Sequence, residues 1–345
     1  MLRVSRLLVV TGTIGVLAVG GCGGGAEVGA PPGGESAMST ATPSSDAAPR
    51  GELPAADGRT TTAVHRVEVG GSPCGVAVGF GAVWVSVTDD AELVRLDPAT
   101  GGETGRLALS AKPCEITVTA DSLWVVTQSG VVDRVDPETL RLRSSVETGF
   151  ASYQAAEAFG AVWVSNRGSQ SLTRIDPDTE QATTVELPGI NAGGLVAAGG
   201  ALWVGDDTTG SGVVVRVDPE SSQIREIEVG GDRPAYLTAT GDTVWVSRVR
   251  SGTVSALDAR TGQPVGEPVP AGSSPVNLHA SPDGRWVWVP DDRGDLLTRI
   301  DAETGAAVER LRVGSGPAVV APTDDGVWVT NFGDGTVWYL RTDPA

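Results

Sequence analysis

The side chain with the greatest catalytic potential is His279, one of only two histidines in the chain. It lies in Asn277-Leu278-His279, within a predicted inner strand that would project Asn277 and His279 to the same side. Glu115 is the only acid at the equivalent positions of the repeats described below, and His65 falls in a more polar, outer segment. General acid–base catalysis and metal binding need more than one imidazole and one carboxylate. We therefore expect His279 to be structural, with no catalytic residue, no cofactor and no metal site.

Two of the three cysteines can form a disulfide. Cys74 and Cys114 each stand ten residues before a tryptophan, Trp84 and Trp124. If those tryptophans mark equivalent positions of adjacent structural units, the cysteines begin neighbouring inner strands. A disulfide needs Cα atoms about 4.4–6.8 Å apart, which such strands can reach, and export to an oxidising compartment favours it. We expect a Cys74–Cys114 disulfide, with two small buried thiols as the alternative.

The elements that position these residues are marked by seven copies of an apolar-Trp-Val triplet. Successive tryptophans are separated by 40, 39, 40, 42, 43 and 40 residues. The seven are Trp84, Trp124, Trp163, Trp203, Trp245, Trp288 and Trp328. A repeat of about 40 residues is typical of propeller blades, each of which buries its apolar faces against its neighbours.

Each copy contains four strand-like segments separated by turn signals. A glycine turn such as Gly79-Phe80-Gly81 precedes the Trp strand, and the third segment ends in a turn such as Asp97-Pro98. Asp accepts hydrogen bonds from a turn backbone, and Pro presets φ. The pattern predicts an all-β fold, a seven-bladed β-propeller with four-stranded blades, over residues 62–345. The last copy stops after its third strand, so we expect the segment 64–69 to complete the last blade.

A binding face follows from this topology. In a propeller, the loops from the fourth strand to the next first strand, and from the second to the third, lie on one face with the channel mouth. Polar groups of both signs that converge on a concave mouth are typical of ligand sites, although each could instead cap its own loop. The candidate binding residues are Glu115, Gln154, Asn166, Arg167, Asp206, Tyr236, Arg248, Asn277, His279, Asp291 and Asn331.

The charge balance limits the partners. Lys and Arg number 25 against 43 Asp and Glu, a formal net charge of −18. A nucleic-acid-binding surface has to neutralise phosphates, so this balance argues against a nucleic-acid partner. The ligand is unknown from the sequence, and a small molecule, a peptide, a glycan and an envelope protein remain open. We expect a binding, sensing or protein-interaction module.

The N-terminus predicts export and anchoring. Residues 1–22 combine Arg3 and Arg6 with an apolar run at 7–19 that is too short to span a bilayer. The run ends in Val19-Gly20-Gly21-Cys22, which resembles the bacterial lipobox and implies lipidation of Cys22. Residues 23–61, rich in Gly, Pro, Ser and Ala, are expected to form a disordered tether. The protein would then be exported and held at the outer face of the cell membrane by the lipid alone.

The repeats over residues 64–341 resemble the YVTN-type and NHL-type bacterial propellers and the superfamily that includes virginiamycin B lyase. This resemblance implies the propeller fold and one alternative function, a magnesium-dependent lyase centred on His279. Asn277 stands where such an enzyme would need a carboxylate, and a second catalytic histidine is missing. Residues 255–263 are similar to the start of the docking repeat of quinone-dependent dehydrogenase propellers, but the expected Trp does not follow.

Overall fold

The computed structural model describes residues 63–342. The predicted signal peptide, the lipobox with Cys22 and the tether at 23–61 lie outside the described residues, and those assignments stay predictions. Within the described range, the one helix is the short 3-10 turn η1 (Val249–Ser251). None of the helical segments at 63–342 is long and apolar enough to cross a membrane.

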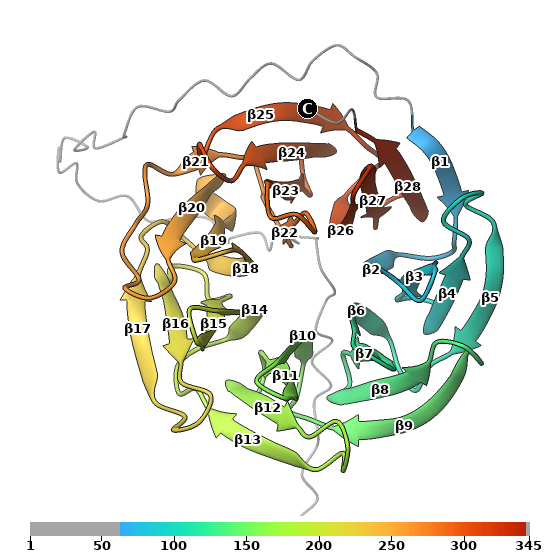
Figure 1. Cartoon of the computed structure of the whole chain (residues 1–345), viewed down its shortest axis with the longest axis horizontal. Helices are drawn as coiled ribbons and strands as arrows, with labels where there is room; N and C mark the ends of the chain where they lie inside the picture. Colours follow the sequence, from blue (N-terminus) through green and yellow to red (C-terminus); the bar gives the residue numbers. More distant parts are fainter. Residues whose placement is uncertain (1–62, 343–345) are drawn as a thin grey trace, which may run out of the picture. The chain divides into compact units, whose positions relative to one another are not determined.

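Seven antiparallel four-stranded sheets stand around a ring, which confirms the predicted all-β seven-bladed propeller (Figure 1). Blade 1 comprises β2 (Pro73–Gly79), β3 (Ala82–Val87), β4 (Glu92–Leu96) and β5 (Glu103–Ala108). Blade 2 comprises β6 (Pro113–Val118), β7 (Leu123–Thr127), β8 (Val131–Asp136) and β9 (Arg141–Glu147). Blade 3 comprises β10 (Ser152–Ala158), β11 (Ala161–Asn166), β12 (Ser171–Ile175) and β13 (Ala182–Glu186).

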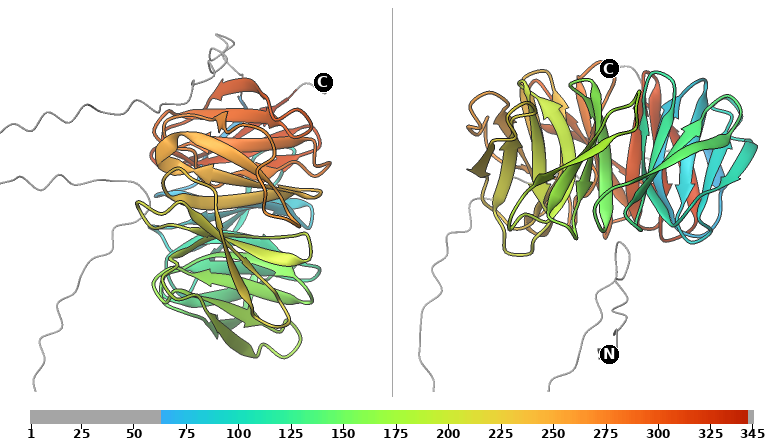
Figure 2. Two further views of the ribbon diagram at one scale, coloured as in Figure 1. Left: turned by 90° about the vertical axis from the view of Figure 1, so that its left-hand side faces the viewer. Right: turned by 90° about the horizontal axis from the view of Figure 1, so that it is seen from below.

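The remaining blades continue around the ring, and the strands run between two faces where the loops gather (Figure 2). Blade 4 comprises β14 (Ala192–Ala198), β15 (Ala201–Asp206), β16 (Val213–Val217) and β17 (Ile224–Glu228). Blade 5 comprises β18 (Pro234–Thr240), β19 (Thr243–Arg248), β20 (Thr253–Asp258) and β21 (Val269–Pro270). Blade 6 comprises β22 (His279–Ala280), β23 (Trp286–Asp291), β24 (Leu296–Asp301) and β25 (Ala307–Arg312).

Blade 7 is closed by a strand from the other end of the described chain. It comprises β26 (Pro317–Thr323), β27 (Gly326–Asn331), β28 (Thr336–Arg341) and β1 (Ala63–Glu68). β1 pairs antiparallel with β28, so that Val67 lies opposite Val337. The prediction that residues 64–69 complete the last blade is confirmed.

The seven repeat tryptophans pack at the interfaces between neighbouring blades. All of them are among the largest fully buried side chains of the protein. Trp84 of blade 1, for example, packs in one cluster with Ile116 and Leu123 of blade 2. Burial of such a side chain stabilises the fold by about 1.5–3 kcal/mol. The apolar triplets therefore hold neighbouring sheets together, and we assign these tryptophans no functional role.

The predicted aspartate turns are also confirmed. Asp97 accepts hydrogen bonds at Oδ1 from the backbone N–H groups of Ala99 and Thr100, at 2.9 and 2.8 Å. The same two-bond turn recurs at Asp136, Asp176, Asp218, Asp258 and Asp301. These hydrogen bonds favour the charged carboxylate, so the pKa of each of these aspartates lies below its ordinary value.

Blade 6 departs from the expected strand at Asn277. Regular pairing in its innermost strand covers only His279–Ala280, and Pro275 makes an isolated bridge to Asp291. Asn277 has φ 24°, outside the range of extended backbone. The prediction that Asn277 and His279 project to the same side of one regular strand is therefore wrong, because the backbone turns between Pro275 and His279.

Candidate functional site at the channel mouth

One face carries the loops that surround the channel mouth. The loop before β2 is tied to the loop after β3, since Asp90 accepts from the Gly71 N–H at 3.0 Å and Asp89 from the Ser72 hydroxyl at 2.7 Å. Equivalent pairs of loops in the other blades bring the predicted binding residues to this same end of the strands. The mouth is thus built from segments spaced about one blade apart in the sequence.

Four predicted residues are buried in the channel wall: Glu115, Gln154 and Tyr236 within inner strands, and Asn277 just before the inner strand of blade 6. Gln154 Oε1 accepts from the Leu195 N–H of the next blade at 2.6 Å. Asn277 Nδ2 donates to the Ala318 carbonyl oxygen at 3.1 Å, and the Tyr153 hydroxyl donates to Asn277 Oδ1 at 3.4 Å. Gln154 and Asn277 therefore link inner strands across blades.

Glu115 is different, because its Oε1 has no hydrogen-bond partner within the described residues. The residue is 4% exposed. Burial raises the pKa of its carboxyl to about 7, with only the Ile116 N–H opposing that shift. Neutral and charged forms of Glu115 therefore coexist near neutral pH.

Four other predicted residues are buried at the ends of second strands and bond to nearby loop and strand residues. Asp291 accepts from the backbone N–H groups of Ser273 and Ser274 at 2.9 and 2.8 Å. Asp206 accepts from the Thr208 hydroxyl at 2.7 Å. The side-chain amides of the remaining two donate instead: Asn166 Nδ2 to the Ser171 and Thr173 hydroxyls, and Asn331 Nδ2 to the Thr336 hydroxyl. These side chains shape the loops beneath the mouth.

Arg248 and Arg167 are the predicted cations of this face, and they have different surroundings. Arg248 donates to the Thr253 hydroxyl at 3.0 Å and to the Val229 carbonyl oxygen at 3.1 Å. It is partly buried, and burial lowers the pKa of its guanidinium. Arg167 lies with its guanidinium carbon 4.2 Å from the centre of the Tyr153 ring. Arg167 therefore belongs to a cluster that sequence reasoning recognised only in part.

That cluster is centred on Asp207, which joins three blades. Its carboxylate bonds to Arg167 Nη2 at 2.6 Å and to Arg233 Nε, and its side chain is 3% exposed. The two arginine side chains remain 32% and 31% exposed. Beneath them, the rings of Tyr153 and Tyr236 lie 5.8 Å apart. We call Tyr153, Arg167, Asp207, Arg233 and Tyr236 the mouth cluster.

Sequence reasoning did not single out Arg233 and Tyr153. Arg233 immediately precedes Pro234, which begins β18. The backbone of Arg233 is left-handed, with φ 60°, so its charged side chain lies at a turn directly before the strand. Tyr153 stands where blades 1 and 2 carry Cys74 and Cys114. A comparison of repeat positions could have found the tyrosine, since an aromatic residue replaces a small one at the channel wall.

His279 lies deeper, in the innermost strand of blade 6, opposite Trp288. Burial lowers the pKa of its imidazole to about 4, and its Nε2 has no partner within residues 63–342. The other blades place small or medium side chains opposite their tryptophans, namely Ala77, Thr117, Ala156, Val196, Thr238 and Ala321. No group of three His, Cys, Asp or Glu residues in the described part of the chain could hold a metal ion. The residues around His279 therefore do not fit a magnesium site, and we derive no step through one.

Cys74 and Cys114 form a disulfide between blades 1 and 2, with Cα atoms 5.0 Å apart. Both residues are buried. The adjoining Gly75 permits this close approach, because a Cβ there would lie 2.1 Å from the Cys114 carbonyl oxygen. The covalent link thus joins inner strands next to the place where the ring closes.

The fold and the polar mouth together define an all-β propeller, in which a ring of similar blades surrounds a polar channel entrance. The family model described as outer membrane protein assembly factor BamB matches residues 49–308. The chain belongs to this family. No curated protein sequence matches the chain.

Two solved structures show the same fold. Hydrazine synthase from Kuenenia stuttgartiensis is similar with a TM-score of 0.69 and 16% identity, over 80% of this chain and 97% of that one. Catalytically inactive virginiamycin B lyase from Staphylococcus aureus, solved with quinupristin, is similar with a TM-score of 0.68 and 15% identity, over 81% of this chain and 98% of that one. At these identities the likeness concerns the fold, which hosts many unrelated functions.

Proposed function

We propose that this protein is an exported, lipid-anchored binding or protein-interaction module of the cell envelope, and that its ligand contacts the channel mouth. The chain belongs to a family described as outer membrane protein assembly factor BamB, and this membership supports the envelope location. The lipobox-like Val19-Gly20-Gly21-Cys22 supports anchoring through Cys22. The ligand class stays open among small molecules, peptides, glycans and envelope proteins.

The observation that carries this proposal is the mouth cluster. Asp207 is shielded from solvent between Arg167 and Arg233, so it orients both guanidinium groups while leaving a third of each exposed. Oriented guanidinium groups bind acceptor oxygens at lower entropic cost than mobile ones. The rings of Tyr153 and Tyr236 provide a rigid apolar floor with polar ends. Such a combination of fixed donors and aromatic surface is typical of binding sites.

Site-specific photo-crosslinking in intact cells tests the binding face. A photoreactive residue replaces Arg250, an exposed residue of η1 in the loop after β19 at the mouth, and in a control chain it replaces the exposed Ala99 in the blade 1 turn on the opposite face. We expect crosslinks from position 250 alone, and their loss when Arg233→Gln is added. Equal crosslinking from both positions, or crosslinks that survive Arg233→Gln, would remove the mouth from the proposal.

The anchor is tested separately. The Cys22→Ser chain should leave the membrane fraction, and the mature wild-type N-terminus should carry acyl chains by mass spectrometry. Two acyl chains suffice for stable anchoring. A membrane-bound Cys22→Ser chain would contradict lipidation at this residue, without bearing on the mouth.

A further inference from the structure

A groove of about 530 Å³ opens between blades 3 and 4, away from the channel mouth. It is lined by the β10–β11 turn, by β12 and β13, and by the turn after β16. Those turns lie at the strand ends opposite the mouth loops, so the groove and the mouth cluster are separate sites. The residues that matter for its chemistry are Phe159, Arg174, Thr183, Glu220 and Ser222.

Arg174 occupies a recurring position of the propeller. In five blades an arginine lies opposite the repeat tryptophan on the neighbouring strand. Four of the five have a partner for the guanidinium: Arg95 bonds to Thr104, Arg134 to Glu180, Arg216 to the Gly199 carbonyl, and Arg299 to Glu309. Within residues 63–342, the guanidinium of Arg174 has no hydrogen bond and no carboxylate within 4.0 Å.

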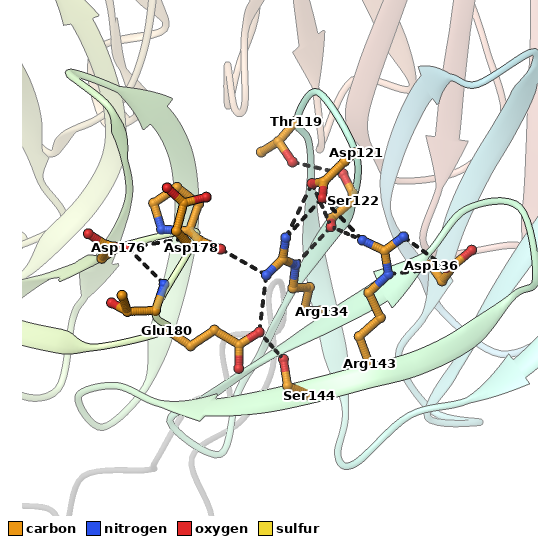
Figure 3. A network of polar contacts seen from close by, with 12 residues as sticks. Thr119, Asp121, Ser122, Arg134, Asp136, Arg143, Ser144, Asp176, Asp178 and Glu180 are labelled. Carbon is orange, nitrogen blue, oxygen red and sulfur yellow. Dashed lines mark hydrogen bonds and ion pairs between the residues drawn. The ribbon is translucent and has the colours of Figure 1, made fainter.

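The preceding interface shows how acidic side chains can occupy this position. Between blades 2 and 3, Arg134 bonds to Glu180 Oε1 at 3.1 Å and to the Pro177 carbonyl oxygen at 2.9 Å, and it pairs with Asp121 at 3.1 Å (Figure 3). Ser144 also donates to Glu180, at 2.7 Å. The arginine of that interface is thus neutralised by two acids.

Both acids are missing at the interface of blades 3 and 4. Glu180 lies four residues after the turn aspartate Asp176, and the same count from Asp218 reaches Ser222. Asp121 lies three residues before its repeat tryptophan, and the same position in blade 3 is Gly160. At the interface of blades 3 and 4, the neutral residues Ser222 and Gly160 thus stand where the interface of blades 2 and 3 has carboxylates, and Arg174 lacks both acidic partners.

Phe159 at the groove rim is placed at an energetic disadvantage. It has φ 52°, in the left-handed region, and is 45% exposed. A left-handed conformation disfavours a residue with a Cβ by about 1–2 kcal/mol, and an exposed ring recovers little of that by burial. Phe80 takes the same conformation at the same turn of blade 1, with the same exposure, so this turn accepts an exposed ring; at Phe159 that ring lies beside the groove and offers it an apolar surface.

We propose that this groove binds a Glu or Asp side chain of an extended segment in a partner protein. The ligand carboxylate pairs with Arg174 in the way that Glu180 pairs with Arg134, and an adjoining apolar side chain packs on Phe159. Charge complementarity selects an acidic ligand, since the one acid that lines the groove, Glu220, lies beyond 4.0 Å from the guanidinium. The neighbouring Asp176 is already engaged by the N–H groups of its turn.

The test measures binding of a fluorescein-labelled blocked peptide, Gly-Leu-Glu-Leu-Gly, to the full chain by fluorescence anisotropy. Its matched control is the peptide with Gln in place of Glu. We expect the Glu peptide alone to bind, and Arg174→Gln to weaken it at least about tenfold, as the loss of one charge-assisted pair does. Arg216→Gln, at the same register in blade 4, should leave binding unchanged.

Ser222→Glu is the sharper variant, because it restores the acid found at the preceding interface. Glu180 itself has φ 59° and Ser222 has φ 58°, so the backbone accepts Glu at this position. We expect this variant to fold with an unchanged or higher melting temperature. Its affinity for the Glu peptide should fall at least about tenfold. Equal binding of the Glu and Gln peptides, no binding to the wild type, or binding that survives Ser222→Glu would overturn the proposal. Binding that appears only after residues 23–61 are deleted would assign the groove to the chain's own acidic segment instead. None of these outcomes depends on the mouth cluster.

Discussion

The hydroxyl of Thr330 donates a 2.6 Å hydrogen bond to the carbonyl oxygen of Cys74, joining the last blade to the first across 256 residues of sequence. The same hydroxyl accepts from the Val319 N–H at 3.1 Å. Both groups are buried, so this one side chain satisfies a donor in its own blade and an acceptor in the next. The same cross-blade bond runs from Ser86 to Cys114, from Ser165 to Gly193 and from Ser247 to Pro275.

Thr330→Val should therefore lower the free energy of unfolding by about 1–3 kcal/mol, because it leaves the buried Cys74 carbonyl and Val319 N–H without partners. Thr330→Ser keeps the hydroxyl and should lose much less. Urea unfolding followed by tryptophan fluorescence measures both. A Val variant as stable as the Ser variant would show that the hydroxyl does not hold the closure.

Removing the strand β1 should open the ring at blade 7. Deletion of residues 62–68 exposes the outer edge of β28. In the wild type this edge pairs with β1, with Val67 opposite Val337. An unpaired edge templates association between chains, so we expect oligomers or aggregates in size-exclusion chromatography. Deletion of residues 30–50 keeps β1 and serves as the control. A soluble monomer without β1, with an unchanged melting temperature, would contradict this role.

The Cys74–Cys114 disulfide closes a segment with a sequence separation of 40. Its removal by Cys74→Ser and Cys114→Ser together should lower the free energy of unfolding by about 2–4 kcal/mol, chiefly by freeing the unfolded chain. Denaturing the oxidised protein without reductant should expose neither thiol to alkylation, as read by peptide mass spectrometry. Stoichiometric labelling of both cysteines would show that the native protein carries free thiols.

The repeat period was sufficient to predict the blades, since each tryptophan in the apolar triplets is buried where the pattern requires. The aspartate turns were predictable for a related reason: Asp97 bonds to residues two and three positions away, so the interaction is local. The mouth cluster was not predictable, because Asp207 meets Arg167 and Arg233 only after three blades are placed around the ring. Asn277 was misassigned because its backbone, with φ 24°, leaves the extended conformation between the Pro275–Asp291 bridge and the His279–Trp288 pair.

Glu115 should make the protein less stable as the pH rises. Its pKa is about 7 in the folded state against an ordinary 4.5, so the folded state binds the proton more tightly between these values. The stabilising effect of the neutral form is present below pH 4.5 and is lost as the pH passes 7, by at most about 3 kcal/mol. Glu115→Gln should thus raise the melting temperature more at pH 8 than at pH 5, by differential scanning calorimetry. An equal gain at both pH values would show that Glu115 ionises freely in the folded protein.

His279 should act in the opposite direction, on the acid side. Burial lowers the pKa of its imidazole to about 4 from 6.5, so between these values the unfolded state binds a proton that the folded state does not. Stability is therefore lost as the pH falls from 6.5 to 4, by about 1–3 kcal/mol for this residue. His279→Thr takes the residue that blades 2 and 5 place opposite their tryptophans, Thr117 and Thr238, and should fold in the same ring. Its free energy of unfolding should fall less steeply than that of the wild type over this interval, as measured by urea titrations at several pH values. Parallel curves for the two proteins would mean that the wild-type imidazole is protonated within the folded channel, and the buried neutral state assigned to it would be wrong.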